Sequence, residues 1–363
     1  MTLGKGSSIG EKLDGLPEDV RARLDRFGFD RERLLYFSDR LRQGDIDNRV
    51  TARVEPPPPE CIEHLPAPGS AGYRQLVEAG EALLREGSVA MVVLAGGMAT
   101  RMGGVVKALV EALPGKTFLD LRLSALRSEA SCFGKAPPLW FMTSPATDEA
   151  LRAALGPRLD DPNVAVFPQY VSLRLNKDGS LFLDAAGRPS EHAPGHGDLV
   201  QALQESGLLD RFVVGGGRLV LIANLDNLGA TLDPAVIGFH LEHGAPVTSE
   251  VVRKVGSDRG GVPVVVDGKL QALEEFRLPP DFDAASVRVF NINTFLVDAK
   301  TLSELNMNFT YFAVDKSVEG EHVVQFERLI NEITHALETR YVEVPREGAA
   351  SRFLPVKDSE ELA

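Results

Sequence analysis

A glycine-rich segment followed by basic residues is the first part of this sequence that could do chemistry. Residues 94–104 read Leu-Ala-Gly-Gly-Met-Ala-Thr-Arg-Met-Gly-Gly, and Lys107 follows. Glycines let a backbone approach a ligand closely, backbone N–H groups can cradle phosphates, and Arg101 and Lys107 supply positive charge. The pattern is neither GxGxxG nor GxxxxGK(S/T), which weakens the dinucleotide-fold and Walker interpretations. The alternative, a sharp turn with solvated basic side chains, is the weaker hypothesis at this spacing.

Two single residues could join such a site. His196 stands between Gly195 and Gly197 in a predicted loop, and the flanking glycines indicate backbone crowding against something, so we favour a binding role over a structural one. Asp226 ends a predicted buried strand, where a carboxylate is costly unless it is paired or bound to a metal. Mg²⁺ accepts one or two carboxylates together with substrate phosphates, so Asp226 is a metal-ligand candidate. Capping of the next helix, aided by Asn227, is the alternative.

The elements that must position these residues alternate along the chain. Apolar runs at 89–95, 139–143, 164–167 and 219–225 are typical of strands buried on both faces, and helices are predicted at 118–132, 147–155 and 234–243. Such alternation predicts an α/β fold whose mainly parallel sheet has helices on both faces. Ligands bind such sheets at the carboxyl ends of the strands, which is where the glycine segment and Asp226 follow.

The remaining segments divide the chain into two parts. Residues 11–45 have helical spacing of apolar residues with a break at Gly28, and the proline run 56–59 must be extended, so residues 1–70 are predicted to form a helical arm and linker. Residues 71–363 are predicted to form the catalytic domain. Within it we expect a helix at 73–85, turns at 176–179 and 267–268, an amphipathic helix at 322–337 and a last strand at 341–344.

Composition excludes several classes of function. The net charge of −13 argues against general binding of nucleic acid or of anionic membranes. The two cysteines are too few for a disulfide framework, and neither lies in a zinc-binding pattern. The first residues lack a signal-peptide core, and apolar runs are strand-sized, so we expect a cytoplasmic protein.

Six segments in order resemble the UDP-glucose pyrophosphorylase family of sugar-phosphate nucleotidyltransferases. They lie between about residues 90 and 357 and are the glycine segment, Pro194–Asp198, Asn224–Gly229, Gly260–Gly261, Phe290–Asn293 and Ser351–Lys357. The resemblance implies a nucleotidyltransferase fold, Rossmann-like and GT-A-like, with a mixed central sheet flanked by helices. The related UDP-N-acetylhexosamine pyrophosphorylases fit less well, because they lack the histidine of the Pro194–Asp198 segment and end differently.

The resemblance also implies a reaction, in which a sugar phosphate oxygen attacks the α-phosphorus of UTP and pyrophosphate leaves. Such a reaction needs positioning and cations rather than a covalent nucleophile. Uridine would be held by the backbone of Leu94, Ala95, Gly96 and Gly97, by Gln169 at the uracil edge, and by Gly195 and His196. Catalytic cations would be Arg101, Lys107 and Lys357, with Mg²⁺ as cofactor on Asp226. Sugar-facing positions would be Asn224, Gly261, Glu274, Asn291 and Asn293, the last two on one side of a strand.

Departures from the family pattern keep alternatives open. Ala99 replaces a usual glycine, and Thr294 replaces a second family asparagine, which puts sugar identity in doubt. The sugar phosphate could be glucose 1-phosphate, another hexose 1-phosphate or an N-acetylhexosamine 1-phosphate. A non-catalytic UDP-sugar-binding protein is the alternative of another class. Because the chain ends six residues after Lys357, without the β-helix of eukaryotic members, we expect a monomer or weak dimer.

Overall fold

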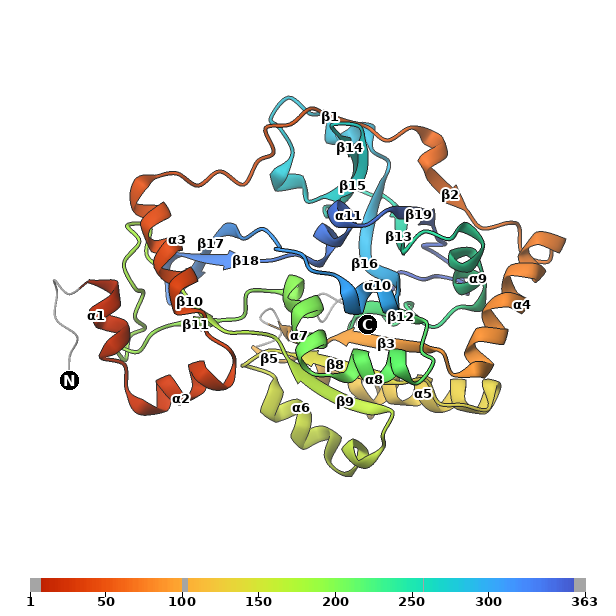
Figure 1. Ribbon diagram of the computed structural model, residues 1–363, viewed down its shortest axis with the longest axis horizontal. Helices are drawn as coiled ribbons and strands as arrows, with labels where there is room; N and C mark the ends of the chain where they lie inside the picture. Colours follow the sequence, from red (N-terminus) through yellow and green to blue (C-terminus); the bar gives the residue numbers. More distant parts are fainter. Residues whose placement is uncertain (1–7, 100–103, 257, 356–363) are drawn as a thin grey trace.

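A mixed sheet forms the centre of the molecule in a computed structural model that describes residues 8–99, 104–256 and 258–355 (Figure 1). In this described part the sheet has eight strands. Their order across the sheet is β2 (Ile62–His64), β19 (Thr339–Glu343), β13 (Val247–Arg253), β16 (Val289–Asp298), β12 (Leu219–Asn224), β3 (Val89–Leu94), β8 (Leu139–Thr143) and β9 (Val164–Pro168). Strand β16 runs antiparallel to both neighbours, and the other pairs are parallel. The prediction of a mixed central sheet is confirmed.

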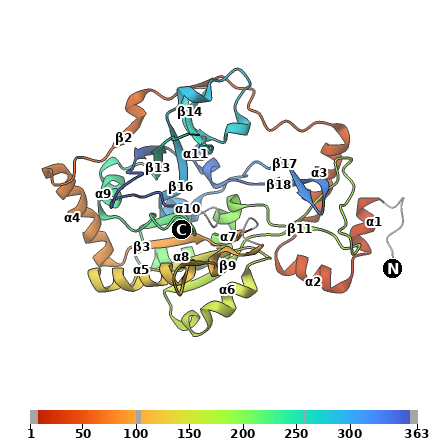
Figure 2. The ribbon, with the colours of Figure 1, turned by 180° about the vertical axis from the view of Figure 1, so that it is seen from behind.

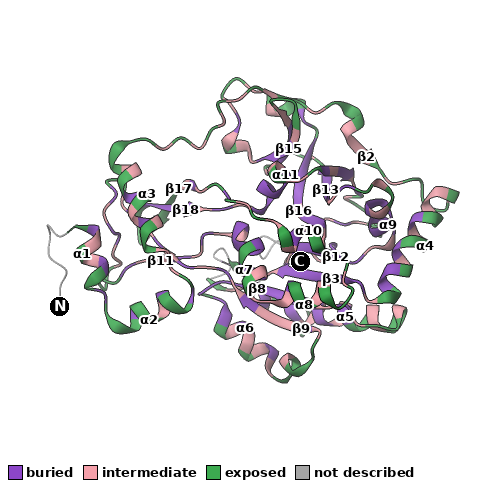
Figure 3. Ribbon diagram, viewed as in Figure 1, coloured by how far each residue is buried: buried purple, intermediate pink, exposed green. Residues whose placement is uncertain are grey.

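The central strands are apolar throughout because both of their faces are covered. Along β3, Val89, Met91 and Val93 enter one hydrophobic core, whereas Ala90 and Val92 enter the core on the opposite face. Alternate side chains of a strand point to opposite faces, so a continuous apolar run fills two cores at once. Figure 3 shows the consequence, with buried central strands and exposed outer faces on the surrounding helices.

Helices cover both faces of the sheet. One face carries α4 (Ala71–Glu86), α5 (Phe118–Phe133), α6 (Asp148–Leu155) and α9 (Pro234–His243), and the other carries α7 (Leu199–Glu205), α8 (Leu208–Val214) and α10 (Ala299–Glu304). Helices α4 and α9 touch at backbone distance. A Cβ on Gly80 or Gly238 would lie well under 3.0 Å from the backbone of the facing helix, so these two positions require glycine. Among the described residues, no helix combines the length and the apolar character that crossing a bilayer requires.

The N-terminal arm consists of α1 (Ile9–Asp14), α2 (Glu18–Arg26) and α3 (Arg31–Gln43). It lies at the opposite end of the molecule from α4, as the front and back views both show (Figures 1 and 2). Its apolar residues share a core with the segment 171–183 and with the hairpin of β17 (Phe312–Val318) and β18 (Glu321–Glu327). The arm therefore packs on the large domain through a hydrophobic core of its own.

Smaller sheets complete the fold. Strands β1 (Val54–Glu55), β14 (Val262–Val266) and β15 (Lys269–Leu273) form one, and β10 (Ser172–Leu173) pairs with β11 (Glu191–His192). Two further pairs of short strands are antiparallel, β4 (Met98–Ala99) with β5 (Val105–Val106) and β6 (Glu111–Leu113) with β7 (Lys116–Thr117). The predicted turns are confirmed: Gly179 closes on Asn176, and Asp267 and Gly268 both have positive φ. The helix break at Gly28 is confirmed too, with φ of 63°.

The predicted helix at 322–337 is wrong. Residues 321–327 form β18 of a hairpin whose turn, Glu319–Gly320, has positive φ at both positions, and only α11 (Ile333–Ala336) is helical, after the short 3-10 turn Ile330–Glu332. The apolar residues of this stretch serve two separate cores. Val324 and Phe326 pack with the arm, whereas Ile330 and Ile333 pack beneath the central sheet. Helical spacing arose because both sets happen to fit one periodicity, and tertiary packing decided the structure.

Candidate functional site

A cavity of about 660 Å³ opens at the carboxyl ends of β3, β8, β9 and β12. The edge is the one at which parallel sheets bind ligands. Many of the predicted site residues line this cavity, although nothing in the structure tests their roles. They are Leu94, Gly96, Gly97, Lys107, Gln169, Gly195, His196, Asn224, Asp226 and Asn293. Arg101 and Lys357 lie outside the described residues.

The glycine segment brings its backbone against an amide side chain. A Cβ on Gly96 would lie well under 3.0 Å from Nε2 of Gln169, so Gly96 leaves space for that amide. Ala95 is buried behind the cavity wall instead of lining it, with its N–H donating to the carbonyl of Met142 at 2.8 Å. The Gly97 carbonyl accepts a hydrogen bond from the Lys107 N–H at 3.2 Å, which holds Lys107 beside the glycine segment.

Gln169 is a buried amide at the cavity, just after β9. Its side chain is 5% exposed, and its Oε1 has no hydrogen-bond partner within the described ranges. A buried amide acceptor left without a partner is costly, and a ligand N–H would remove that cost. The backbone N–H of Gln169 donates to the carbonyl of Thr143 at 2.8 Å, so the residue is anchored to the end of β8, and it is one of the residues that line the cavity.

His196 offers a neutral imidazole to the cavity. Its Nδ1 accepts a hydrogen bond from the Ile330 N–H at 2.8 Å, and burial lowers its pKa to about 4. The hydrogen bond at Nδ1 leaves the proton of the neutral ring on Nε2, so Nε2–H is a donor. The flanking glycines have a different cause: a Cβ would lie 2.8 Å from the Arg328 carbonyl at Gly195 and 2.6 Å from the Arg328 backbone at Gly197. The crowding inferred from the sequence is against the chain itself.

Lys107 and Asp226 meet across the cavity floor. Their Nζ and Oδ2 atoms are 2.5 Å apart, and the two side chains are 19% and 20% exposed. The helix-capping alternative for Asp226 does not hold for α9, because Asp233 caps that helix by accepting from the N–H groups of Ala235 and Val236. Asp226 is thus a carboxylate held at the end of a buried strand by one lysine, open to the cavity.

Arg122 of α5 holds the loop that carries Asp226, and the sequence analysis missed it. Its guanidinium donates to the carbonyls of Asn224 at 2.9 Å, Asn227 at 2.6 Å and Ala230 at 2.7 Å. Burial lowers its pKa to about 10, so it stays charged at neutral pH. The available indication was a basic residue on the otherwise apolar face of the predicted helix 118–132.

The C-terminal segment that contains the family-like string docks beside the same loop. Asn227 donates to the carbonyl of Arg352 at 3.0 Å and accepts from the N–H of Leu354 at 2.9 Å. Arg352 in turn forms a buried two-point ion pair with Glu250, with distances of 2.7 and 2.5 Å. Residues 352–354 are therefore fixed next to the loop after β12, which adjoins the Lys107–Asp226 pair.

The predicted sugar-facing residues fall into two groups. Asn224 and Asn293 line the cavity, whereas Gly261, Glu274 and Asn291 form a neighbouring polar cluster that does not line it. In that cluster the Asn291 N–H donates to the Gly261 carbonyl at 2.7 Å. Burial, followed by the nearby charge of Glu275, raises the pKa of Glu274 to about 7.

Asn331 completes this cluster and was also missed. Its Nδ2 donates to Oε1 of Glu274 at 3.1 Å, while its Oδ1 and the Nδ2 of Asn291 are buried without a partner among the described residues. The expectation that strand alternation places Asn291 and Asn293 on one side fails. Asn293 has φ of 55°, and the register of β16 against β13 shifts at this point, so a bulge separates the two side chains.

The far end of the cavity is lined by residues that the sequence analysis did not single out. They come from β10–β11 and β17–β18 and are Arg174, Glu191, His192, Lys316, Gln325 and Glu327. His192 is 6% exposed, and burial and the charge of Arg174 lower its pKa to about 3. Lys316 pairs with Glu327 at 3.1 Å. The mistaken helix at 322–337 hid the strand that presents Gln325 and Glu327.

The sequence is similar to a known family of enzymes and to individual members of it. The family model of UTP–glucose-1-phosphate uridylyltransferase matches residues 37–363. A UTP–glucose-1-phosphate uridylyltransferase from Hordeum vulgare is 28% identical over 370 residues, which cover 97% of this chain and 76% of that protein.

Two solved structures from Trypanosoma brucei share the fold. A UDP-glucose phosphorylase superposes with a TM-score of 0.75 at 24% identity, covering 97% of this chain and 76% of that one. A uridine diphosphate N-acetylglucosamine pyrophosphorylase superposes with a TM-score of 0.76 at 22% identity, covering 97% and 78%. At these identities the likeness establishes the nucleotidyltransferase-like fold alone.

Proposed function

Because the chain belongs to the UTP–glucose-1-phosphate uridylyltransferase family, we propose that it transfers the uridylyl group of UTP to glucose 1-phosphate, giving UDP-glucose and pyrophosphate. The observation that carries the proposal is the convergence of two pairs in one cavity. Gly96 and Gln169 form a surface for a base edge, and Lys107 with Asp226 forms a charged floor at the ends of neighbouring strands.

The nucleobase would lie against the backbone of 94–97. Uracil presents an N–H donor beside carbonyl acceptors, and the free Oε1 and the Nε2 of Gln169 match that pair. The Nε2–H of His196 adds a donor for a ribose or phosphate oxygen. A site built this way discriminates against bases whose donors mismatch, because its own buried groups would stay unpaired.

The chemical step requires that two anions approach each other. A phosphate oxygen of the sugar phosphate attacks the α-phosphorus of UTP, its bond to phosphorus forms as the bond to the pyrophosphate oxygen breaks, and pyrophosphate leaves with the electron pair. Cations that stabilise the negative charge developing on the leaving pyrophosphate lower the activation barrier of this step. Among the residues that the structure describes, Lys107 is the candidate for such a cation. The family resemblance implies Arg101 and Lys357 as two further cations.

A divalent cation fits beside Asp226. Mg²⁺ commonly takes one or two protein carboxylates and fills its remaining positions with phosphate oxygens and water. Asp226 supplies one carboxylate at the ligand-binding edge of the sheet, and its Oδ2 is held by Lys107. When bound there, Mg²⁺ would neutralise charge on the triphosphate. Asp226 would hold the ion, while other residues of this chain would orient the nucleotide and Lys107 would supply a further positive charge.

The sugar would be recognised by Asn224 and Asn293 in the cavity and by the polar cluster next to it. Unpaired Asn291 Nδ2 and Asn331 Oδ1, together with the carboxyl of Glu274, offer the donors and acceptors that sugar hydroxyls need. Glucose 1-phosphate is the substrate we favour, because the family match names it. The fold likeness to an N-acetylglucosamine enzyme keeps N-acetylhexosamine 1-phosphate and other hexose 1-phosphates as the second candidates.

One assay separates these substrates and also the non-catalytic alternative. Purified protein with UTP and MgCl₂ is given glucose, galactose or N-acetylglucosamine 1-phosphate, and released pyrophosphate is measured. We expect the highest kcat/KM with glucose 1-phosphate. Turnover only with N-acetylglucosamine 1-phosphate would overturn the substrate assignment. Nucleotide binding without turnover on any sugar phosphate would favour a UDP-sugar-binding protein.

A further inference from the structure

The second helix of the arm contacts two separate segments of the cavity wall through one arginine. The Nη2 of Arg23 donates to the carbonyl of Pro145 at 2.7 Å, and its Nε donates to Oε2 of Glu191 at 2.7 Å. Pro145 lies between the cavity-lining residues Ser144 and Ala146, which follow β8, and Glu191 lines the cavity from β11. A single guanidinium thus joins two wall segments that are far apart in the sequence.

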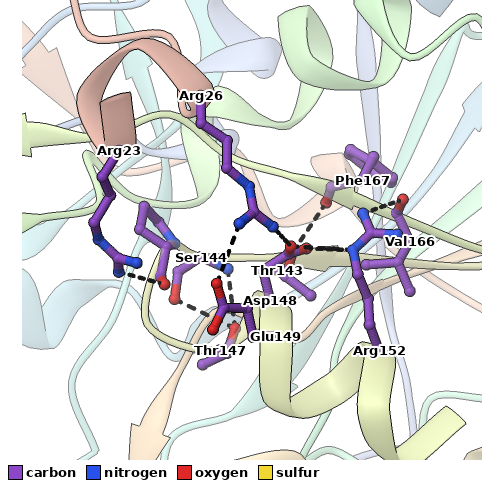
Figure 4. Close-up of polar contacts among 11 residues, drawn as sticks. Arg23, Arg26, Thr143, Ser144, Thr147, Asp148, Glu149, Arg152, Val166 and Phe167 are labelled. Atoms are coloured by element: carbon purple, nitrogen blue, oxygen red, sulfur yellow. Dashed lines mark hydrogen bonds and ion pairs between the residues drawn. The ribbon is translucent and has the colours of Figure 1, made fainter. Parts of the chain in front are cut away.

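A second arginine of α2 reaches the support behind Gln169. Arg26 pairs with Asp148 at 3.2 Å, and Asp148 is 1% exposed (Figure 4). The Asp148 carboxylate also accepts from Thr143 Oγ1 at 2.7 Å and from Arg152 Nε at 3.0 Å. The carbonyl of Thr143 accepts the backbone N–H of Gln169, so the hydrogen-bond chain runs from the arm to the predicted base-reading residue.

The arm also touches the strand extension that follows Gln169. The Val171 N–H donates to the carbonyl of Phe27 at 3.0 Å. Gly28, next in the chain, lies against the ring of Tyr170, where a Cβ would approach a ring carbon to 2.8 Å. Contacts from residues 23–28 therefore reach three segments of the cavity wall, which are the segment after β8, the segment after β9 and β11.

We propose that Arg23 is a positioning residue for UTP, which bridges Pro145, between the cavity-lining Ser144 and Ala146, and Glu191 at the far end of the cavity, so that the cavity keeps its width around the nucleotide. The inference rests on the proposed function and adds to it a role for the arm. Arginine suits this task because its planar fork places two N–H donors in fixed directions, whereas lysine is a single flexible point charge. Arg23 binds the Pro145 carbonyl and the Glu191 side chain, and it is not among the residues that line the cavity. Because it shapes the wall without touching the reacting atoms, we expect it to change the affinity for UTP and to leave kcat nearly unchanged.

The test compares Arg23→Ala and Arg23→Lys with the parent in full-length protein, by UTP titration calorimetry and by steady-state kinetics. We expect the Kd and KM for UTP to rise about tenfold in Arg23→Ala, with kcat within about twofold and Tm close to that of the parent. Arg23→Lys should recover less than half of the lost affinity on a logarithmic scale. If the Arg23→Ala variant fails to fold, the affinity of Arg23→Lys for UTP still tests the proposal.

The matched control is Arg31→Ala. Arg31 carries the same charge on the same arm, but its partners, Asp14 at 2.8 Å and the carbonyl of Gly10 at 3.2 Å, both belong to the arm. Its UTP affinity should equal that of the parent. Equal losses in Arg31→Ala and Arg23→Ala would show a general effect of arm stability and would overturn the proposal, as would unchanged affinity in Arg23→Ala.

A double variant tests the bridge itself. When Glu191 is already alanine, Arg23→Ala can no longer break the bridge to that wall, so its effect on the Kd for UTP should shrink. Fully additive effects would contradict the bridge. Binding of UTP by the parent is measured first. If the parent binds UTP but shows no turnover, the proposed reaction fails while the Arg23 comparison on Kd stands, and if the parent does not bind UTP both fail.

Discussion

Gly96→Ala tests whether the Gly96–Gln169 pair recognises the nucleobase. The added Cβ would sit well under 3.0 Å from the amide nitrogen of Gln169, which is the far end of a flexible side chain, and 3.3 Å from Cβ of Ser144. The amide must therefore move, while the backbone stays in place because φ of Gly96 is outside the left-handed region. We expect the loss to fall on the ligand contact and not on the fold.

The magnitude follows from the two hydrogen bonds that Gln169 would make at the uracil edge under the proposed function. A typical protein hydrogen bond contributes about 1 kcal/mol net, and a buried group left unpaired costs about 1–3 kcal/mol. Displacing Gln169 should therefore weaken UTP binding by about 2 kcal/mol, or about 30-fold in Kd. Discrimination between UTP and CTP should fall with it, because the edge is no longer read.

Calorimetric titration with UTP and CTP measures both effects, and a double variant assigns them. In a Gln169→Ala background, Gly96→Ala should add little, since the group it displaces is already gone. A Kd for UTP within about twofold of the parent in Gly96→Ala would show that Gln169 does not read the base. An equally large effect of Gly96→Ala in the Gln169→Ala background would show the same.

Two further predictions concern carboxylates. Asp226→Asn should lose most Mg²⁺-dependent turnover while melting near the parent, and full activity with Mg²⁺ in the pyrophosphate assay would remove its metal role. Burial raises the pKa of Glu274 to about 7, above its unfolded value near 4.5, so the native state binds more protons between these values and stability falls as pH rises through this window. Glu274→Gln should flatten that fall in denaturant titrations from pH 5 to 7, and an unchanged slope would contradict the shift.

Local patterns predicted the central elements well. Strand β8 at 139–143 and helix α9 at 234–243 have the predicted limits. A continuous apolar run marks the strand, and a proline at the start and a glycine after the end mark the helix. The sequence of the β17–β18 hairpin contains no boundary signals of this kind that are stronger than the accidental helical spacing of its apolar residues. Its strands are specified by the arm core, which is assembled from parts distant in sequence.

The same distinction applies to the site. Gly96 and Asp226 lie in strings that resemble the family, so their place at the cavity could be predicted. Arg122, Arg174 and Asn331 hold backbone or other side chains, and their partners come from remote elements. Nothing in their neighbours along the chain states those partners, so these roles became visible only in the fold.

The Lys107–Asp226 pair leads to a last prediction about charge. Together the two groups are neutral, and UTP brings several negative charges to a protein whose net charge is already −13. If Mg²⁺ engaged Asp226, as proposed, the Lys107 ammonium would become available to phosphate. Asp226→Asn mimics that release, so without Mg²⁺ it should bind UTP more tightly than the parent, by about 1 kcal/mol for a part-exposed pair or about fivefold in Kd. In a Lys107→Ala background the gain should shrink, since the lysine that Asp226 neutralises is absent. Metal-free UTP binding that is equal or weaker in Asp226→Asn would show that Asp226 does not hold Lys107 away from phosphate.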